Sequence, residues 1–288
     1  MKVIDILNRK KVTISFEVFP PKTTANYASV EYATEKIAAL KPDFMSVTYG
    51  AGGGTSEYTL NIAKNLKDKY GTDVLPHLTC VSSSREHVRK MISLYKEKGF
   101  QNIMALRGDI PEGGRVAFDY TYASELIEDI RNLTEDDFCI GGACYPEVHP
   151  DSATKDEDIE NLKRKVDAGC EFLTTQMFFD NSILYNFLYR IRKHGIDVPV
   201  LAGIMPITNK KQVARTVAMS GTQLPQRFIS MVDRFGNNPE AMKQAGIIYA
   251  TEQIVDLISN DVNHIHVYTM NKPEIAEGIL NNISELIK

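Results

Sequence analysis

The stretch NIMALRGDIP, residues 102–111, shows how this chain is built. It begins with a short apolar run, residues 103–106, of the kind that forms a buried parallel strand. The run then changes within one residue to Arg107, Gly108 and Asp109, a turn-forming and charged sequence. A buried strand with this ending brings its charged residues to the rim of a sheet, where they can reach a ligand. A local bridge between Arg107 and Asp109 would account for the same residues.

The same alternation of an apolar run and a polar ending recurs along the chain. Strands are expected at residues 12–19, 44–49, 74–80, 103–106, 138–144, 172–178, 200–204 and 264–268. Helices are expected at residues 23–40, 57–69, 84–99, 122–132, 155–168, 181–193, 210–219, 226–235 and 239–259, and a last one begins at Pro273.

Eight alternating β and α elements predict an α/β protein with the (β/α)8 TIM barrel fold. The gap between strands 7 and 8 is about twice as long as the others and holds extra helices, and ~250 residues is the usual size of the fold. We expect one catalytic domain over residues 1–288. The alternative is an open, doubly wound sheet, which is disfavoured because the first βα turn, FPPKTT, lacks the glycines of a dinucleotide-binding turn.

Composition favours an ordinary cytoplasmic enzyme, because 43% of the residues are hydrophobic and 24% are charged. A net charge of -4 gives no electrostatic reason to expect a nucleic acid or a membrane as partner, and no apolar run approaches the ~20 residues that span a bilayer. The start, MKVIDILNRKK, lacks the apolar core of a secretory signal. Four irregularly spaced cysteines without a C-x-x-C pair predict buried free thiols in a reducing compartment.

Polar residues gather where the expected strands end. In a barrel these ends meet at one mouth. The loops of the opposite end, KPD, KYGT, KGFQ, AGCE and HGID, are short and generic, so this asymmetry predicts an active site at the mouth. The polar residues at the strand ends are Glu17, Thr48, Tyr49, His77, Thr79, Arg107, Asp109, Tyr145, Glu147, His149, Gln176 and Tyr268.

Glu17 is the predicted acid of this site. It lies between Phe16 and Val18, next to a Pro-Pro turn, and a carboxyl group in an apolar rim should have a raised pKa, which suits a general acid. A carboxylate paired with Lys22 is the alternative.

Several other residues allow two interpretations. His77 could be a satisfied polar group or a ligand contact. His264 and His266 share a strand face, but no third ligand stands at metal spacing, so structural packing is favoured and no metal site is predicted. The glycines at 50 and 52–54 match no phosphate-binding motif and favour a flexible loop. Lys165 belongs to a charged helix face that is either solvated or close enough to the mouth to meet a phosphate.

Seven motifs, taken together, resemble one family. In order they are FEVFPPK, SVTYGAGG, PHLTC, ALRGD, YPEVHP, NLKRKVDAG and TQMFFD, beginning at residues 16, 46, 76, 105, 145, 161 and 175. Their sequence resembles methylenetetrahydrofolate reductase of the bacterial type, catalytic domain only. The resemblance implies non-covalent FAD at the barrel mouth. It also implies reduction of 5,10-methylenetetrahydrofolate to 5-methyltetrahydrofolate by NADH or NADPH, which would feed methionine synthesis.

The resemblance also implies roles for residues at matching positions. Glu17 and Asp109 would be catalytic. Cofactor-binding residues would be Thr48, His77, Arg107, Gly108, Asp109, Tyr122, Ala123, Tyr145, His149, Asp158 and Lys165, and substrate-binding residues Glu17, Asp109, Gln176, Tyr268 and Lys272. Two positions depart from the family. Lys272 stands where an Arg is common and cannot offer its bidentate fork, and Thr216 stands where some members have an aromatic residue.

The implied chemistry explains these residue types. Protonation of a ring nitrogen opens the folate ring to an iminium cation, which then accepts a hydride; Glu17 would supply the proton and Asp109 would stabilise the cation. Both substrates would use one flavin face in turn, which predicts ping-pong kinetics. The alternatives are a flavin-free pterin-binding barrel, acting as a methyltransferase or carrier, and a non-catalytic subunit of a redox complex. Sequence leaves open the choice of nicotinamide and whether faces such as residues 226–235 join copies in a homo-oligomer.

Overall fold

A closed parallel barrel forms the centre of the computed structural model, which describes residues 1–21, 23–49, 56–81, 83–110, 114 and 117–288. Each strand pairs with the next in the chain, and the last pairs with the first. The predicted TIM barrel is therefore confirmed. The strands are β1 (Thr13–Val18), β2 (Phe44–Val47), β3 (Val74–Thr79), β4 (Asn102–Leu106), β5 (Cys139–Cys144), β6 (Phe172–Thr175), β7 (Val200–Ile204) and β8 (His264–Tyr268).

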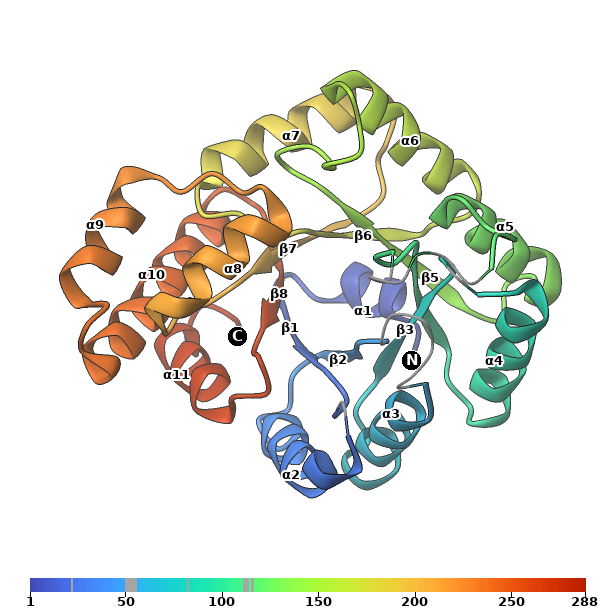
Figure 1. Cartoon of the computed structure of the whole chain (residues 1–288), viewed down its shortest axis with the longest axis horizontal. Coiled ribbons are helices and arrows are strands. Elements are labelled where there is room, and N and C mark those ends of the chain that lie inside the picture. The colour runs from blue at the N-terminus through green and yellow to red at the C-terminus, as the bar shows by residue number, and fades with distance from the viewer. Residues whose placement is uncertain (22, 50–55, 82, 111–113, 115–116) are drawn as a thin grey trace.

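Helices surround the barrel as an outer ring, and α1 lies inside that ring (Figure 1). As predicted, three helices separate β7 from β8. The helices are α1 (Val3–Arg9), the short 3-10 helix η1 (Thr24–Asn26), α2 (Tyr27–Ala38), α3 (Ser56–Tyr70), α4 (Arg85–Glu97), α5 (Ala123–Thr134), α6 (Lys155–Asp167), α7 (Asn181–Lys193), α8 (Lys210–Ser220), α9 (Gln226–Phe235), α10 (Pro239–Ser259) and α11 (Pro273–Ile283). Among the described residues, none of these helices has both the length and the apolarity needed to cross a membrane.

The sixth strand is shorter than predicted. It ends at Thr175 rather than at residue 178, although the apolar run continues through Phe178 and Phe179. These two residues are buried, and their carbonyl groups accept hydrogen bonds from Gln253 and Tyr249 of α10. These residues are therefore apolar because they are buried under α10. An apolar run alone does not distinguish such a buried loop from a buried strand.

A helix that was not predicted closes the amino-terminal end of the barrel. The side chains of Val3, Ile6 and Leu7 in α1 pack against residues that begin strands, including Phe44 and Phe172. Their i, i+3, i+4 spacing is helical, but the segment is short, and short helices are marginal without tertiary contacts.

Asn102 fixes α1 to the barrel. Its Oδ1 accepts the backbone N–H of Val3 at 2.7 Å, and its Nδ2 donates to the carbonyl groups of Met1 and Val74 at 3.1 and 3.2 Å. Asn102 is 2% exposed, and its bonds to Val3 and Val74 are buried. A buried amide satisfied in this way holds the start of the chain in one position.

At the opposite end, Tyr268 connects β8 to β6 across the intervening β7. Its hydroxyl donates to the carbonyl of Thr175 at 2.6 Å. The crossing requires Gly203 in β7, because a Cβ there would stand 2.3 Å from the Thr175 carbonyl oxygen and 2.6 Å from the Tyr268 hydroxyl. The missing side chain thus allows the tyrosine to lie across the strand.

Candidate active site

Glu17 lies in a polar cluster inside the mouth of the barrel. Its Oε2 accepts a hydrogen bond from the Ser46 hydroxyl at 3.2 Å. The Nε2 atoms of His77 and His266 stand 3.5 and 3.6 Å from the same oxygen. The four residues come from β1, β2, β3 and β8, so only closure of the barrel brings them together.

His266 belongs to this cluster, although the sequence favoured a packing role for it. Its Nδ1 is 2.7 Å from the Ser15 hydroxyl and its Nε2 is 3.2 Å from the Ser46 hydroxyl. His264, two residues earlier, instead contacts Thr13 at 3.0 Å. The alternation of a strand could have revealed the site, because it places His266 on the same face as the selected Tyr268. Within the described residues, no group of His, Cys, Asp or Glu could hold a metal ion.

The prediction of a raised pKa for Glu17 is wrong for this structure. Burial by itself raises the pKa of the carboxyl group. The imidazole of His266, the positive charge of His77 or His266 when protonated, and the Ser46 hydroxyl together lower this pKa below its ordinary value. The apolar neighbours of Glu17 in the sequence point to the opposite side of the strand, so they do not set the environment of its carboxyl group.

His77 is expected to make folding stability depend on pH. Burial lowers its pKa from 6.5 to about 4 against the opposing charge of Glu17. Between these values the unfolded chain binds a proton at this histidine and the folded chain does not, so stability should fall as the pH drops. Across the whole range between these two pKa values, the free energy of unfolding should fall by about 3 kcal/mol.

Urea unfolding at pH 7.0 and pH 5.0 measures this effect in the wild type and in His77→Gln. The variant should lose less stability between the two pH values, because glutamine does not titrate. Equal losses in the two proteins would contradict the assignment.

A second group of predicted residues lines another part of the mouth. Arg107 Nη1 pairs with Asp151 at 2.6 Å, so a local bridge to Asp109 is not what this arginine forms. Asp109 is exposed, and burial together with the charge of Asp109 raises the pKa of Tyr145 to about 12. The Tyr145 and His149 rings meet edge to face with centroids 4.5 Å apart.

The α6 residues of the predicted flavin set are bonded to neighbouring parts of the protein. Lys165 Nζ donates to the Ala143 carbonyl at 2.5 Å, and its stem packs against Gly142, where a Cβ would stand 2.8 Å from Lys165 Cδ. Burial lowers the pKa of this ammonium group. Asp158 accepts a hydrogen bond from the Ser152 hydroxyl at 3.1 Å. In this arrangement the Lys165 ammonium is bonded to the wall and is not a free cation in the mouth.

The remaining predicted residues follow other strands. The Thr48 carbonyl accepts from Thr59, Tyr122 is exposed just before α5, and Ala123 is the buried first residue of that helix. Gln176 Oε1 accepts the N–H of Met177 at 3.0 Å, and Lys272 Nζ donates to the Thr208 hydroxyl at 3.3 Å.

Three sequence features lie outside the described residues. They are Lys22, the glycines at 50 and 52–54, and Pro111.

Thr79 places a buried hydroxyl on the wall of the mouth. It lies on the same strand face as His77 and is 5% exposed, and its hydroxyl has no hydrogen-bond partner among the described residues. Gly108 packs against it with φ +84°, and a Cβ there would stand 2.9 Å from Thr79 Cβ. A buried hydroxyl without a partner is costly, so a bound molecule with a polar edge fits this wall. Its position at a strand end was visible in the sequence, but Thr79 was not among the predicted site residues.

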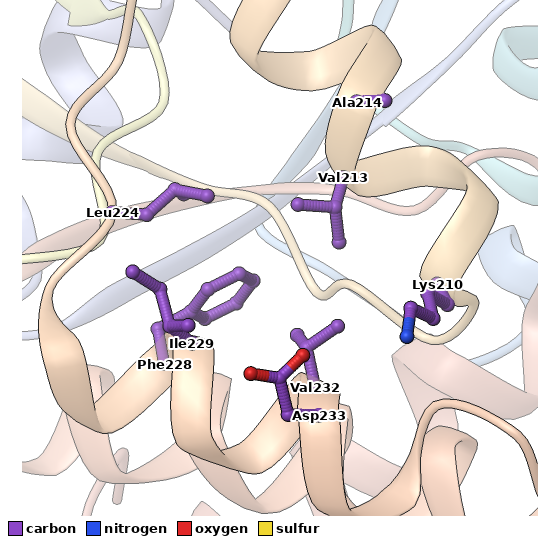
Figure 2. A pocket seen from close by; sticks show the side chains of 8 residues that line it. All are labelled: Lys210, Val213, Ala214, Leu224, Phe228, Ile229, Val232 and Asp233. Atoms are coloured by element: carbon purple, nitrogen blue, oxygen red, sulfur yellow. The ribbon is translucent and has the colours of Figure 1, made fainter.

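A separate cavity of about 290 Å³ opens between α8 and α9 (Figure 2). Val213 of α8 faces Phe228 and Val232 of α9 across it, with Lys210 and Asp233 at its edge. None of its lining residues belongs to the predicted site, so this cavity is distinct from the mouth.

The fold and the mouth together define an enzyme of the TIM-barrel class, because polar and titratable side chains converge at the carboxyl ends of the strands. Residues 2–284 match the family model of methylenetetrahydrofolate reductase. The chain belongs to the methylenetetrahydrofolate reductase family, a family of oxidoreductases.

Individual relatives agree with this assignment. The 5,10-methylenetetrahydrofolate reductase of Pectobacterium carotovorum is 37% identical over 274 residues, 95% of this chain and 90% of that protein. The Escherichia coli enzyme of the same name is 36% identical over 273 residues, 95% of this chain and 91% of that protein.

Among solved structures, a Clostridium thermocellum protein that binds two copies of 5-methyl-5,6,7,8-tetrahydrofolic acid has a TM-score of 0.68. At 15% identity, over 98% of this chain and 97% of that one, the likeness shows the shared fold.

Proposed function

We propose that this protein reduces 5,10-methylenetetrahydrofolate to 5-methyltetrahydrofolate, with non-covalently bound FAD and a nicotinamide nucleotide as reductant. The observation that carries the proposal is the cluster of Glu17, Ser46, His77 and His266 at the mouth of a barrel of this family. The reaction needs a proton and a hydride at one site, and this cluster can hold the proton. The product would feed methionine synthesis.

FAD would supply the hydride when bound, and the mouth fits such a molecule. His77, Arg107, Tyr145 and His149 offer polar and aromatic surfaces there, and the unpartnered Thr79 hydroxyl adds a further polar group. Our assignment for the cofactor also includes Thr48, Gly108, Asp109, Tyr122, Ala123 and Asp158. Lys165, whose ammonium is bonded to the Ala143 carbonyl, would act on the cofactor only through that strand. The buried thiols of Cys139, Cys144 and Cys170, which form no disulfide among the described residues, support a reducing, cytoplasmic location.

The protein's task in the folate step is to hold a proton at Glu17 Oε2. A carboxyl group with a lowered pKa is a poor isolated acid near neutral pH. We assign the proton to Glu17 and His266 as a coupled pair, since Ser46 contacts both of them at 3.2 Å. Ser15 holds the far nitrogen of His266 and so fixes the imidazole ring. Protonation of a folate nitrogen by this pair would open the five-membered ring.

Four further residues complete the assignment. Gln176 would orient the pterin through its amide, and Asp109 would stabilise the developing cation and influence the potential of the flavin. Tyr268 and Lys272 stay in the folate set, Lys272 as a partner for the glutamate tail of the substrate.

Asp109→Asn is expected to slow the folate half-reaction by about tenfold or more, because a charge that stabilises the cation is lost. It should also make the bound flavin easier to reduce, since a nearby negative charge is removed. Stopped-flow absorbance and a dye-equilibrated redox titration measure the two effects. Asp136→Asn, at an exposed carboxylate in the turn before β5, is the control and should change neither. An unchanged half-reaction and potential in Asp109→Asn would contradict this role.

The visible spectrum of the purified protein tests the proposed function. We expect a yellow protein that NADH or NADPH bleaches without oxygen and that 5,10-methylenetetrahydrofolate reoxidises, with parallel double-reciprocal lines in steady state. A colourless protein that binds pterins would support a flavin-free methyltransferase or carrier. A yellow protein that neither nicotinamide reduces would support a redox subunit. Comparing the two nicotinamides at equal concentration identifies the preferred reductant.

A further inference from the structure

Glu147 joins two loops of the barrel mouth. It lies between β5 and α6, two residues after Tyr145 and two before His149. Its Oε2 accepts the backbone N–H of Gln223 at 2.9 Å. Gln223 belongs to the connection between α8 and α9, which is 76 residues away in the chain.

The surroundings of Glu147 are costly to maintain. Its Oε1 is buried and has no hydrogen-bond partner among the described residues. Val148, the next residue, has φ +132°, which is strained for a β-branched side chain. Strain of this kind persists when the surrounding structure imposes it, and it gathers at functional sites. A surface carboxylate without a task would avoid both costs.

The same connection is also attached to the loop after β6. The hydroxyl of Thr222 donates to the carbonyl of Met177 at 3.2 Å, next to Gln176 of the predicted folate set. Within α8, the hydroxyl of Ser220 donates to the carbonyl of Thr216 at 2.7 Å. Thr216, Ser220 and Thr222 are all less than 10% exposed, so this polar end of α8 is buried against the mouth loops.

The start of α8 lies close to another predicted folate residue. Lys272 Nζ contacts the Thr208 hydroxyl, and the N–H of Thr208 donates to Gln212 Oε1 at 3.1 Å. The helix therefore extends from the neighbourhood of Lys272 to that of Gln176, which places it along the folate side of the mouth.

The other side of α8 faces α9 across an open pocket. This cavity of about 290 Å³ is lined by Val213 and Ala214 of α8 and by Phe228 and Val232 of α9 (Figure 2). Val213 is partly buried against the apolar cluster that contains Phe228 and Val232. The hydrogen bonds at the end of α8 add to this packing in holding the helix.

We propose that Glu147 is a positioning residue that holds α8 at the folate side of the mouth by fixing Gln223. The flavin side of the mouth, with Tyr145 and His149, is thereby connected to the folate side through one carboxylate. This inference rests on the proposed function in one respect, namely that Gln176 and Lys272 handle the folate.

The test compares Glu147→Ala and Glu147→Gln with Glu157→Ala. Glu157 is a matched control, because its Oε2 also accepts a backbone N–H after β5, from Ala153 at 2.8 Å, but this contact spans 4 residues of the chain where that of Glu147 spans 76. Glutamine keeps an acceptor oxygen for the N–H of Gln223. The readouts are hydrogen exchange of residues 216–224, the KM for 5,10-methylenetetrahydrofolate, and the limiting rate of flavin reduction at saturating nicotinamide.

In Glu147→Ala we expect exchange at residues 216–224 to rise by about tenfold and the folate KM to rise by a similar factor, as for one lost hydrogen bond to a charged acceptor. The limiting rate of flavin reduction should stay within about twofold, because α8 is assigned to the folate side. In Glu147→Gln both the exchange of residues 216–224 and the folate KM should return most of the way to the wild-type values. Glu157→Ala should match the wild type.

Two results would overturn the inference. One is unchanged exchange at residues 216–224 in Glu147→Ala, and the other is an equal loss in both half-reactions, which would indicate general damage. The exchange measurement needs neither flavin nor folate. It therefore tests the contact between Glu147 and Gln223 even if the wild type does not reduce the folate. Such a failure would count against the proposed function alone.

Discussion

Glu17→Gln is expected to lower the rate of folate reduction by about 10²–10⁴-fold, the contribution typical of a general acid. Glutamine preserves the size of the side chain and can still contact Ser46, but it cannot hold the transferable proton at Oε2. The reduction of bound flavin by nicotinamide should stay within about twofold, because that half-reaction requires no proton from Glu17. Stopped-flow measurement of each half-reaction separates the two.

His266→Gln distinguishes the coupled pair from an isolated carboxyl group. If Glu17 and His266 share the proton, this variant should also slow the folate half-reaction and shift its pH profile. His264→Gln is the matched control, since His264 lies on the same strand but contacts Thr13 away from Glu17. Full folate turnover by Glu17→Gln would remove the acid assignment. A wild-type pH profile in His266→Gln would contradict the sharing of the proton with His266, and Glu17 would then be the acid by itself.

Leu7→Ala is expected to destabilise the protein by about 2–5 kcal/mol, the usual cost of removing a buried leucine side chain. Leu7 is 4% exposed and belongs to the apolar cluster that α1 forms with the first residues of the strands. The hydrogen bond between Val3 and Asn102 fixes the helix, so the cavity has little freedom to collapse. Urea unfolding at neutral pH measures the change.

Asn8→Ala is the control for this prediction, because Asn8 is the next residue of the same helix and is exposed. Its effect should stay within about 0.5 kcal/mol, as for most surface substitutions. Equal stability of Leu7→Ala and the wild type would mean that α1 does not contribute to the barrel core.

Local patterns were sufficient for the order and kind of the main elements. The helices at residues 181–193, 226–235 and 239–259 have their predicted bounds, as do the strands at 200–204 and 264–268. Each is bounded by turn residues or by a capping residue such as Asp180 or Asn238, whose side chains accept backbone N–H groups. These signals act within a few residues, so the sequence displays them directly.

The sequence predicted which residues lie at the site, but it did not predict the contacts between them. Strand ends identified Glu17, His77 and Tyr268, and parallel strands of a barrel must bring such ends to one mouth. The contacts of Ser46 and His266 with Glu17 and the pairing of Arg107 with Asp151 appear only in the tertiary structure. Each joins residues from different βα units, and no local signal specifies such a partner.

By itself, then, the sequence determined the eight βα units and the family, through short-range patterns and motif order. Only the tertiary structure determined the closure of the barrel bottom by α1, the lowered pKa of Glu17 and the contact between Glu147 and Gln223. The physical reason is the same for all three. A helix of seven residues, the charge state of a carboxyl group and the partner of a buried oxygen depend on atoms brought close by folding. Those atoms belong to segments that are far apart along the chain.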